Sequence, residues 1–290
     1  MANNIELFKQ YVPLLDEVYK NASLTADLDG AEDLARQGAN ANEMVIPMLS
    51  MDGLADYDRN GGYVGGDATL NYETVACNYD RGRKFSVDAM DDEETANIAY
   101  GRLAGEFIRT KVAPEIDAFR LASYASESGI STASADLSTG AAVVAALRAC
   151  VTKMDEDEVP KENRYLFITP TLRGMIEDLD TTKSKAVLAE FAKVISVPQS
   201  RFYSKVQLND GKEGGVKAGG YAKASGAKNL NFLAIHKDAV IQFQKHVAPR
   251  VFSPEQNQNA DAWQYTYRNV GIAKLYANKL AGVYAHTATT

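Results

Sequence analysis

The sequence predicts an α+β fold in which some segments carry too few apolar residues to form a core of their own. Three patterns support this class. A helical stripe of apolar residues runs from residue 93 to about 126, two extended runs flank a stretch rich in glycine and aspartate, and helix and strand patterns alternate beyond residue 140. No internal repeat is visible, which excludes a repeat architecture.

The first 45 residues predict an arm rather than a folded unit. Residues 5–20 place apolar side chains at helical spacing, although Pro13 should bend or interrupt a helix there. Residues 23–43 are small and polar and predict an extended, poorly packed segment. Such a segment needs another surface to rest on, and a neighbouring subunit would provide one.

A long β-hairpin is predicted next. Residues 44–51 form a short strand-like run, and the pattern from Leu70 to Val87 is again extended, with a break expected at residues 80–83. The stretch between the two runs supplies a glycine-rich tip. Because its core-facing content is small and an isolated hairpin is marginally stable in water, we expect it to lie on a partner.

The strongest pattern is a single long helix over residues 93–126. Apolar side chains recur every three or four residues, and about 30 residues at 1.5 Å each give a length of about 45–50 Å. Pro114 should kink this helix without ending it, since the stripe continues beyond it. The other faces carry charged residues that we expect to meet solvent or other chains: Arg102, Glu106, Arg109, Lys111 and Glu115.

A connector at 127–140, rich in Ser, Thr, Gly and Ala, is the best interior boundary, and a mixed α/β region follows it. The patterns predict a helix at 141–154, a buried strand at 164–170, a short helix capped by Thr171, and a helical stretch at 185–195. Residues 229–247 read as strands or a strand–helix step. Alternating aromatic residues at Trp263, Tyr265 and Tyr267 then predict a closing strand, continued to residue 286 as strand or hairpin.

The composition and motifs do not indicate catalysis. The net charge is −7, and the two cysteines and three histidines show no metal-ligand spacing, so we expect buried thiols, no metal and no cofactor. No serine nucleophile elbow, phosphate-binding loop, signal peptide or membrane-spanning run is visible. The glycine- and lysine-rich stretch 209–228 is typical of a surface loop. One alternative remains, a soluble α+β enzyme that binds an anionic ligand there.

Two blocks of this sequence resemble the major capsid proteins of tailed phages, which share the Hong Kong 97 type shell fold with encapsulins. The first is NYDRGRKFSVDAMDDEETANIAYGRLAGEFIRTKVAPEIDAFRLA (78–122), and the second runs from residue 239 to residue 286. The resemblance implies four parts. They are an N-terminal arm (1–45), an extended β-hairpin loop (46–92), a peripheral domain with the spine helix (93–135, with return strands at 246–290) and an axial domain (136–245).

The same resemblance implies a structural protein and not an enzyme. A major capsid protein assembles into hexamers and pentamers of an icosahedral shell around phage double-stranded DNA, in the bacterial host cytoplasm and then as the virion capsid. The implied partners are copies of itself, a separate scaffolding protein, a portal and a decoration protein, with non-specific DNA contact and no membrane. An encapsulin-like compartment shell is the alternative within this fold. Residues 53–75 contain no lysine, which argues against a covalent cross-link from the loop.

Six charged residues near the junction of loop and long helix are our candidates for subunit contacts. They are Arg81, Arg83, Lys84, Glu106, Arg109 and Lys111.

Overall fold

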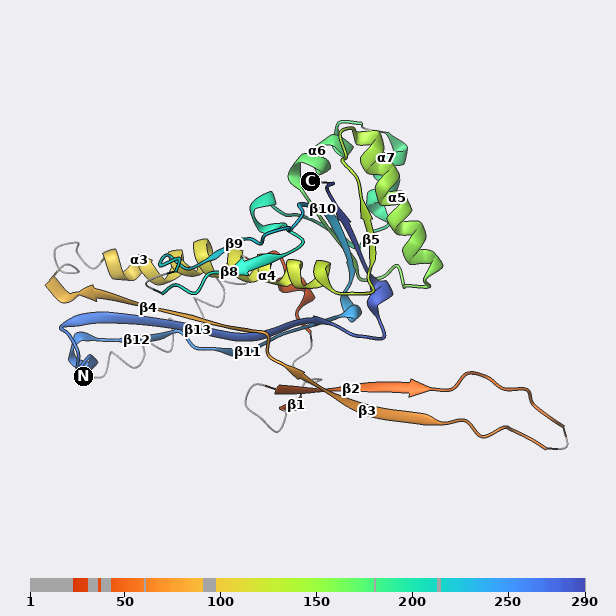
Figure 1. The fold of residues 1–290 in the computed structure, drawn as a ribbon, viewed down its shortest axis with the longest axis horizontal. Coiled ribbons are helices and arrows are strands. Elements are labelled where there is room, and N and C mark those ends of the chain that lie inside the picture. Colours follow the sequence, from red (N-terminus) through yellow and green to blue (C-terminus); the bar gives the residue numbers. More distant parts are fainter. Residues whose placement is uncertain are drawn as a thin grey trace.

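The computed structural model describes residues 23–30, 36–37, 43–59, 61–90, 98–179, 181–212 and 215–289. Figure 1 shows an elongated body in which a long helix lies over a sheet, a lobe in which three helices pack on a second sheet, and a hairpin that projects away from both. The chain crosses between body and lobe several times, so the two share core residues. The helical part of the N-terminal prediction, residues 5–20, lies outside the described residues.

The projecting element is the predicted β-hairpin. Strand β2 (Glu43–Met51) pairs antiparallel with β3 (Ala68–Ala76) over their full length, and the short strand β1 (Arg36–Gln37) pairs with the start of β2. The prediction of two strands around a glycine-rich tip is confirmed. The predicted break at 80–83 is wrong, because the second strand of the hairpin ends at Ala76.

Residues 80–83 instead lie inside β4 (Tyr79–Asp88), which belongs to another sheet. Strand β4 pairs along ten residues with β13 (Ala262–Leu275), and the other edge of β13 carries β12 (Arg250–Phe252) and β11 (Val240–Val247). Gly82 does not interrupt the strand. A Cβ there would lie 2.8 Å from the carbonyl oxygen of Tyr267, so glycine permits the close approach of the two strands.

The long helix is continuous from Ile98 to Ser126. It consists of α3 (Ile98–Phe107), a π-helical turn (η3, Ile108–Val112) and α4 (Ala113–Ser126). Pro114 lies in the first turn of α4. Proline cannot donate a backbone hydrogen bond to the preceding turn, and the wider π turn lies at that point. The prediction that the helix passes through the proline is confirmed.

The long helix packs on the four-stranded sheet through the predicted apolar stripe. Ala104, Ile108, Val112 and Ile116 are buried against tyrosines of β4 and β13, among them Tyr265. The spacing of three and four residues brings these side chains to one helix face.

The lobe contains a five-stranded sheet in the order β5-β14-β10-β6-β7. The strands are β5 (Ser131–Ser134), β6 (Arg164–Ile168), β7 (Lys193–Ser196), β10 (Leu230–His236) and β14 (Val283–Thr287). One face is covered by α5 (Gly140–Glu156), α6 (Pro170–Glu177) and α7 (Thr182–Ala189). A two-stranded sheet of β8 (Val206–Leu208) and β9 (Tyr221–Lys223) lies beside the long helix. Short 3-10 turns occur at Ala26–Leu28, Gln199–Arg201, Lys237–Ala239, Pro254–Gln256 and Leu280–Gly282.

Three local predictions in this lobe are wrong. Thr171 does not cap a helix, because Thr169 precedes Pro170, the first residue of α6. The helical stretch predicted to reach residue 195 ends at Ala189, and Lys193–Ser196 forms β7 in parallel with β6. The 127–140 connector contains β5, which pairs in parallel with β14.

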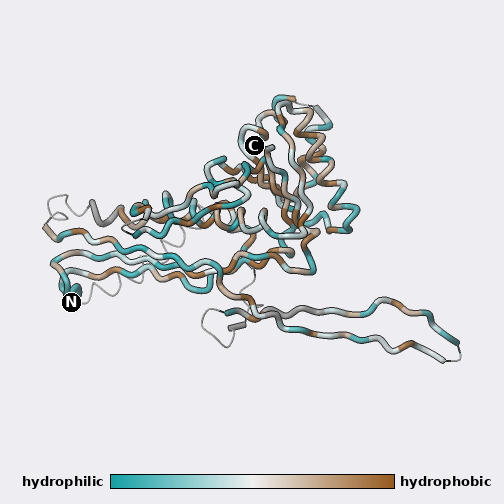
Figure 2. Tube along the Cα trace, in the orientation of Figure 1, coloured by the Kyte–Doolittle hydropathy of each residue, from teal (hydrophilic) through white to brown (hydrophobic). Residues whose placement is uncertain are grey.

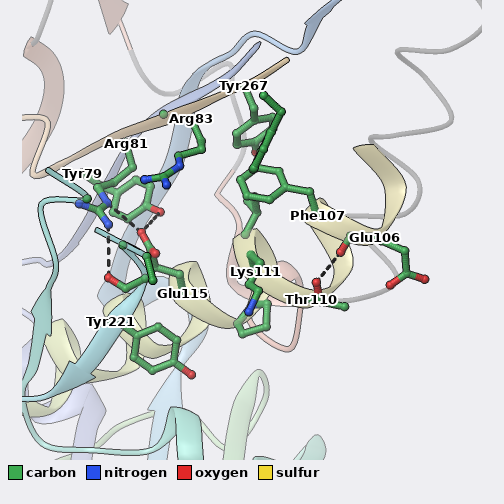
Figure 3. Close-up of a pocket in the computed structure, with 18 of the residues that line it drawn as sticks. Tyr79, Arg81, Arg83, Glu106, Phe107, Thr110, Lys111, Glu115, Tyr221 and Tyr267 are labelled. Atoms are coloured by element: carbon green, nitrogen blue, oxygen red, sulfur yellow. Dashed lines mark hydrogen bonds and ion pairs between the residues drawn. The ribbon is translucent and has the colours of Figure 1, made fainter. Parts of the chain in front are cut away.

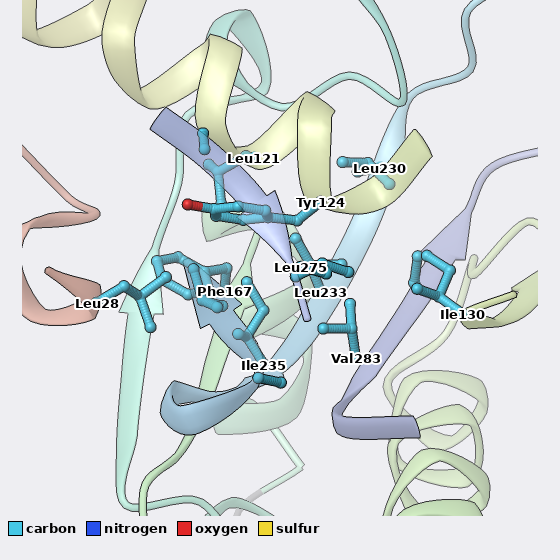
Figure 4. Close-up of a cluster of buried hydrophobic side chains, with 14 of the residues drawn as sticks. Leu28, Leu121, Tyr124, Ile130, Phe167, Leu230, Leu233, Ile235, Leu275 and Val283 are labelled. Carbon is cyan, nitrogen blue, oxygen red and sulfur yellow. The ribbon is translucent and has the colours of Figure 1, made fainter. Parts of the chain in front are cut away.

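The opposite face of the five-stranded sheet packs against α4 and residues from the start of the chain. Figure 4 shows Leu121 and Tyr124 of α4 above Phe167 and Leu233, with Leu28 closing one side. Each of these five side chains is at most 1% exposed. Strands β6 and β10 therefore bury both faces, which explains their continuous apolar sequences.

The described part of the N-terminal arm is tightly packed, so the expectation of a poorly packed segment is wrong for residues 23–30. Leu28 lies in the core, and Thr25 is fully buried. The polar residues that predicted a poorly packed arm form hydrogen bonds with buried partners on the long helix and on β11.

Two of the domain boundaries predicted from the sequence do not coincide with the sheets of the structure. Strand β11 begins at Val240, ahead of the limit at 246, yet pairs with β13. Strand β14 returns to the five-stranded sheet, so residues 246–290 do not remain in one sheet and do not form a terminal hairpin. The division into four parts stays a prediction.

Candidate functional site

The hairpin presents apolar side chains to solvent. Of the eleven large hydrophobic residues that are exposed among the described residues, seven lie on this hairpin, and Leu54 and Tyr63 are more than 90% exposed. Figure 2 shows apolar positions among polar ones toward the far end of the hairpin, with no other part of the drawn chain beside them. The seven are Met51, Leu54, Tyr57, Tyr63, Val64, Leu70 and Tyr72. Apolar surface gathered on one projecting element marks a site of interaction.

The tip of the hairpin has a defined geometry. The ring centroids of Tyr57 and Tyr63 are 4.9 Å apart in an edge-to-face arrangement. Between them the backbone N–H of Gly62 donates to the carbonyl of Asp58 at 2.7 Å, and Gly62 takes a φ of +78° that favours glycine. The tip therefore presents two exposed aromatic rings in edge-to-face contact.

The hairpin is also strongly acidic. Residues 43–76 contain six acidic side chains and one basic side chain, Arg59. This segment carries most of the excess negative charge of a chain with a net charge of −7.

A groove of about 1010 Å³ lies between the long helix, β4 and the loop that joins β8 to β9. Figure 3 shows Arg83 and Tyr267 on one side of it, Phe107 and Lys111 on the helix, and Tyr221 on the third side. The ring of Phe107 lies 4.8 Å from that of Phe85 and 6.0 Å from that of Tyr267, both edge to face. The groove thus combines an aromatic wall with basic side chains.

Arg81 fixes the three walls of the groove to one another. Its Nε donates to Glu115 Oε1 at 2.8 Å, and its Nη1 donates to the carbonyl of Asn209 at 2.7 Å. Tyr79 Oη also donates to Glu115, at 3.1 Å. Burial, followed by the charge of Glu115, raises the pKa of Tyr79, so the phenol stays protonated and remains a donor.

Four of the six predicted contact residues line this groove: Arg81, Arg83, Glu106 and Lys111. Lys84 is exposed on β4 outside the groove lining, and Arg109 forms an exposed ion pair with Glu106 at 2.8 Å. Arg83 donates to the carbonyl of Lys217 at 3.1 Å. A role of these residues in subunit contacts stays a prediction.

Glu115, expected on a solvent-facing or chain-facing side of the helix, is buried beneath Arg81. The structure does not describe the side chain of Arg102.

The sequence analysis missed a buried polar cluster around Asp117. This fully buried carboxylate accepts hydrogen bonds from Ser23 Oγ at 2.8 Å, the backbone N–H of Leu24 at 2.9 Å, and both the backbone N–H and the Oγ1 of Thr25. Arg201 Nη1 approaches it at 3.4 Å. The partners lie more than 80 residues away in the sequence, so no local pattern could have revealed the cluster.

The cysteine and histidine side chains differ in burial. Cys150 is buried, and burial raises its pKa to about 12, whereas Cys77 is only half-buried, contrary to expectation. His236 and His286 are buried with lowered pKa values, while His246 is exposed near the end of β11. Within the described ranges no three His, Cys, Asp or Glu side chains gather as a metal site would require. No helix in those ranges has both the length and the apolar character needed to cross a membrane.

Solved structures of other proteins share the fold of this chain. No family model matches the chain, and no curated protein matches its sequence. Among solved structures, one of Mycobacterium phage Che8 is 14% identical with a TM-score of 0.56, covering 91% of this chain and 90% of that one. The capsid structure of cyanophage P-SCSP1u is 11% identical with a TM-score of 0.53, covering 88% and 86%.

A virus-like particle from Pyrococcus furiosus is also similar, at 9% identity with a TM-score of 0.56, covering 95% of this chain and 99% of that one. These likenesses extend over nearly the full length of both chains in each pair. The chain has the Hong Kong 97 type fold found in the capsid subunits of tailed phages.

Proposed function

We propose that this chain is a major capsid protein. Copies of it assemble into hexamers and pentamers, and these form an icosahedral shell that encloses phage double-stranded DNA. The match in fold to a phage capsid structure, over 88% of this chain and 86% of that one, supports this proposal. So does the separation of the chain into a packed body and lobe and a hairpin that projects from them.

The observation that carries the proposal is the set of seven exposed hydrophobic residues on the hairpin. Covering one such side chain gains about 1.5–3 kcal/mol, so covering all seven gains on the order of 10 kcal/mol. A shell subunit recovers this free energy when its hairpin lies on a neighbour. A closed lattice then multiplies contacts that are individually modest.

The role proposed is structural, with no reaction assigned to the chain. The protein is assembled in the host cytoplasm and resides in the virion capsid, with a separate scaffolding protein, a portal and a decoration protein as further partners. A net charge of −7 suits a wall that encloses DNA without binding it tightly, because tight binding to phosphates requires a basic surface.

Shortening the hairpin tests the proposal. Met51 and Ala68 are paired in register, so residues 52–67 can be replaced by Asn-Gly, which closes a two-residue hairpin turn. We expect the wild-type protein to form rings or shells in electron micrographs and the shortened protein to remain in small species. A wild-type protein that stays monomeric at every concentration contradicts the proposal.

The contents of the particles separate the two uses of this fold. Particles purified from phage-producing cells are expected to contain double-stranded DNA. Particles filled with a protein cargo would favour the encapsulin-like compartment instead.

A further inference from the structure

The chain changes direction where the projecting hairpin meets the body. Strand β3 ends at Ala76 and β4 begins at Tyr79, so only Cys77 and Asn78 separate the hairpin from the four-stranded sheet. Figure 1 shows β3 running directly into β4 where the hairpin leaves the body. The direction of the hairpin therefore depends on the contacts of a few residues at its base.

Asn78 ends the pairing of β4 with β13. The last pair of these strands is Tyr79 with Gly271. Continued pairing would place Cys77 opposite Ala273, but the side chain of Asn78 occupies that place. Its Nδ2 donates to the carbonyl of Ala273 at 2.8 Å, and its Oδ1 accepts from the backbone N–H of Ala273 at 3.0 Å. An asparagine amide offers the same donor and acceptor as a peptide group, so Ala273 stays paired while the main chain leaves the sheet.

Two further contacts hold the base of the hairpin on the body. Val75 is the one buried side chain among those described for residues 43–76, and it packs against apolar side chains of β11 and β13. On the other strand of the hairpin, the carbonyl of Glu43 accepts a hydrogen bond from Lys245 Nζ of β11 at 2.9 Å. Both strands of the hairpin are therefore tied to the sheet of the body.

We propose that Asn78 and Lys245 are positioning residues, which set the direction of the hairpin and thereby the rotation between neighbouring copies in the assembled protein. This inference rests on the proposed function and assigns part of it to contacts within one subunit. A closed assembly requires the same rotation between every pair of equivalent copies. A hairpin that reaches from one subunit to another transmits that rotation only when its base is fixed.

The length of the hairpin makes its base decisive. Nine paired residues per strand extend about 30 Å from the anchor. For a rigid arm of that length, a tilt of about 10° at the base moves the far end by about 5 Å. Apolar side chains are in contact only within about 4.5 Å. A tilt of that size therefore removes the exposed hydrophobic residues of the hairpin from the surface that covers them.

Spin labels measure the direction of the hairpin in the unassembled protein. One label is placed at Ser50→Cys near the far end of β2 and the other at Arg148→Cys on α5, since both positions are exposed. Every chain carries Cys77→Ser, because the half-buried thiol of Cys77 would also take a label, whereas Cys150 is buried. The distribution of distances between the two labels then reports how firmly the hairpin is held.

The substitutions compare the anchor with an equivalent pair of contacts elsewhere. We expect Asn78→Ala to broaden the distribution by about 5 Å, and Lys245→Ala to broaden it less, because one hydrogen bond is lost and β3 stays tied. Lys245→Ala also tests the inference if Asn78→Ala does not fold. The matched control is Asn231→Ala, whose side chain contacts the carbonyl of Ala135 at 2.9 Å and His286 Nδ1 at 3.0 Å within the lobe. This control should lose stability without a change in the distribution.

Assembly gives the second readout. In electron micrographs we expect closed particles of the wild type and of Asn231→Ala, and open or irregular assemblies of Asn78→Ala with a loss of closed particles. Equal distance distributions in Asn78→Ala and Asn231→Ala, or closed particles of Asn78→Ala like those of the wild type, overturn the inference and leave the proposed function standing. A wild-type protein that never assembles overturns the proposed function, and the distance distributions still decide whether Asn78 and Lys245 direct the hairpin.

Discussion

Replacing Asp117 with alanine is expected to destabilise the subunit more than any surface charge change. The carboxylate is fully buried and accepts hydrogen bonds from Ser23, Leu24 and Thr25, with Arg201 also close. Each buried donor left without a partner costs about 1–3 kcal/mol. Removing one partner of a buried charge pair costs about 3–5 kcal/mol, and we expect a loss of unfolding free energy in that range.

The assay is urea unfolding followed by the fluorescence of Trp263, the single tryptophan of the chain. The matched control is Asp80→Ala. Asp80 also accepts two hydrogen bonds, from Arg268 at 2.9 and 2.6 Å, but both side chains are exposed, so the loss should stay below about 1 kcal/mol.

Hydrogen exchange gives a local readout of the same substitution. The backbone amides of Leu24 and Thr25 donate to Asp117, so their exchange should accelerate in Asp117→Ala while the amides of α5 stay protected. The reasoning is refuted if Asp117→Ala unfolds like Asp80→Ala, or if exchange at these two amides is unchanged.

Three further outcomes are expected. Gly82→Ala should lower the unfolding free energy by about 1–3 kcal/mol, because the Cβ of the alanine would lie 2.8 Å from the carbonyl oxygen of Tyr267. An alanine variant as stable as the wild type would contradict the close packing of β4 on β13. Burial lowers the pKa of His286, so the unfolded chain binds its proton first as pH falls through about 6.5. Stability should therefore fall below that pH, and urea unfolding at pH 7.5 and 5.5 should show a smaller difference for His286→Gln. Cys150 has a pKa raised to about 12, so at pH 8 its thiolate fraction is on the order of 10⁻⁴, and a thiol reagent should label Cys77 in the native state and Cys150 only after unfolding.

The elements that could be predicted from sequence are those whose pattern is local. The spacing of apolar residues along the long helix shows which face is buried, and the stripe persists through Pro114. The hairpin could be predicted because a glycine-rich stretch separates two extended runs. The hairpin has few side chains that could form a core, so the sequence also indicates that its own chain does not cover it.

The failures arise where distant partners override local preference. Residues 193–196 continue a helical pattern, yet parallel pairing with β6 makes them a strand. Gly82 suggested a break, although it serves the close contact with Tyr267. Ser23 and Thr25 predicted a poorly packed arm, because their acceptor, Asp117, lies more than 90 residues away in the sequence.

The sequence predicts charged residues for subunit contacts, but not the groove in which four of them lie. Arg81, Arg83, Glu106 and Lys111 come from two separate segments of the sequence, and the fold brings all four to one groove. The composition of the loop that closes the groove predicts a surface loop or a stretch that binds an anionic ligand. Its hydrogen bonds to Arg81 and Arg83 depend on tertiary contacts that no motif encodes.

A cryo-electron microscopy reconstruction of the purified, assembled protein tests the central claim most directly. The account predicts closed shells or rings in which every hairpin leaves its own subunit and lies on a neighbouring copy, with its seven exposed hydrophobic residues covered. Subunits that remain monomeric, or particles in which the hairpin stays uncovered, would contradict it.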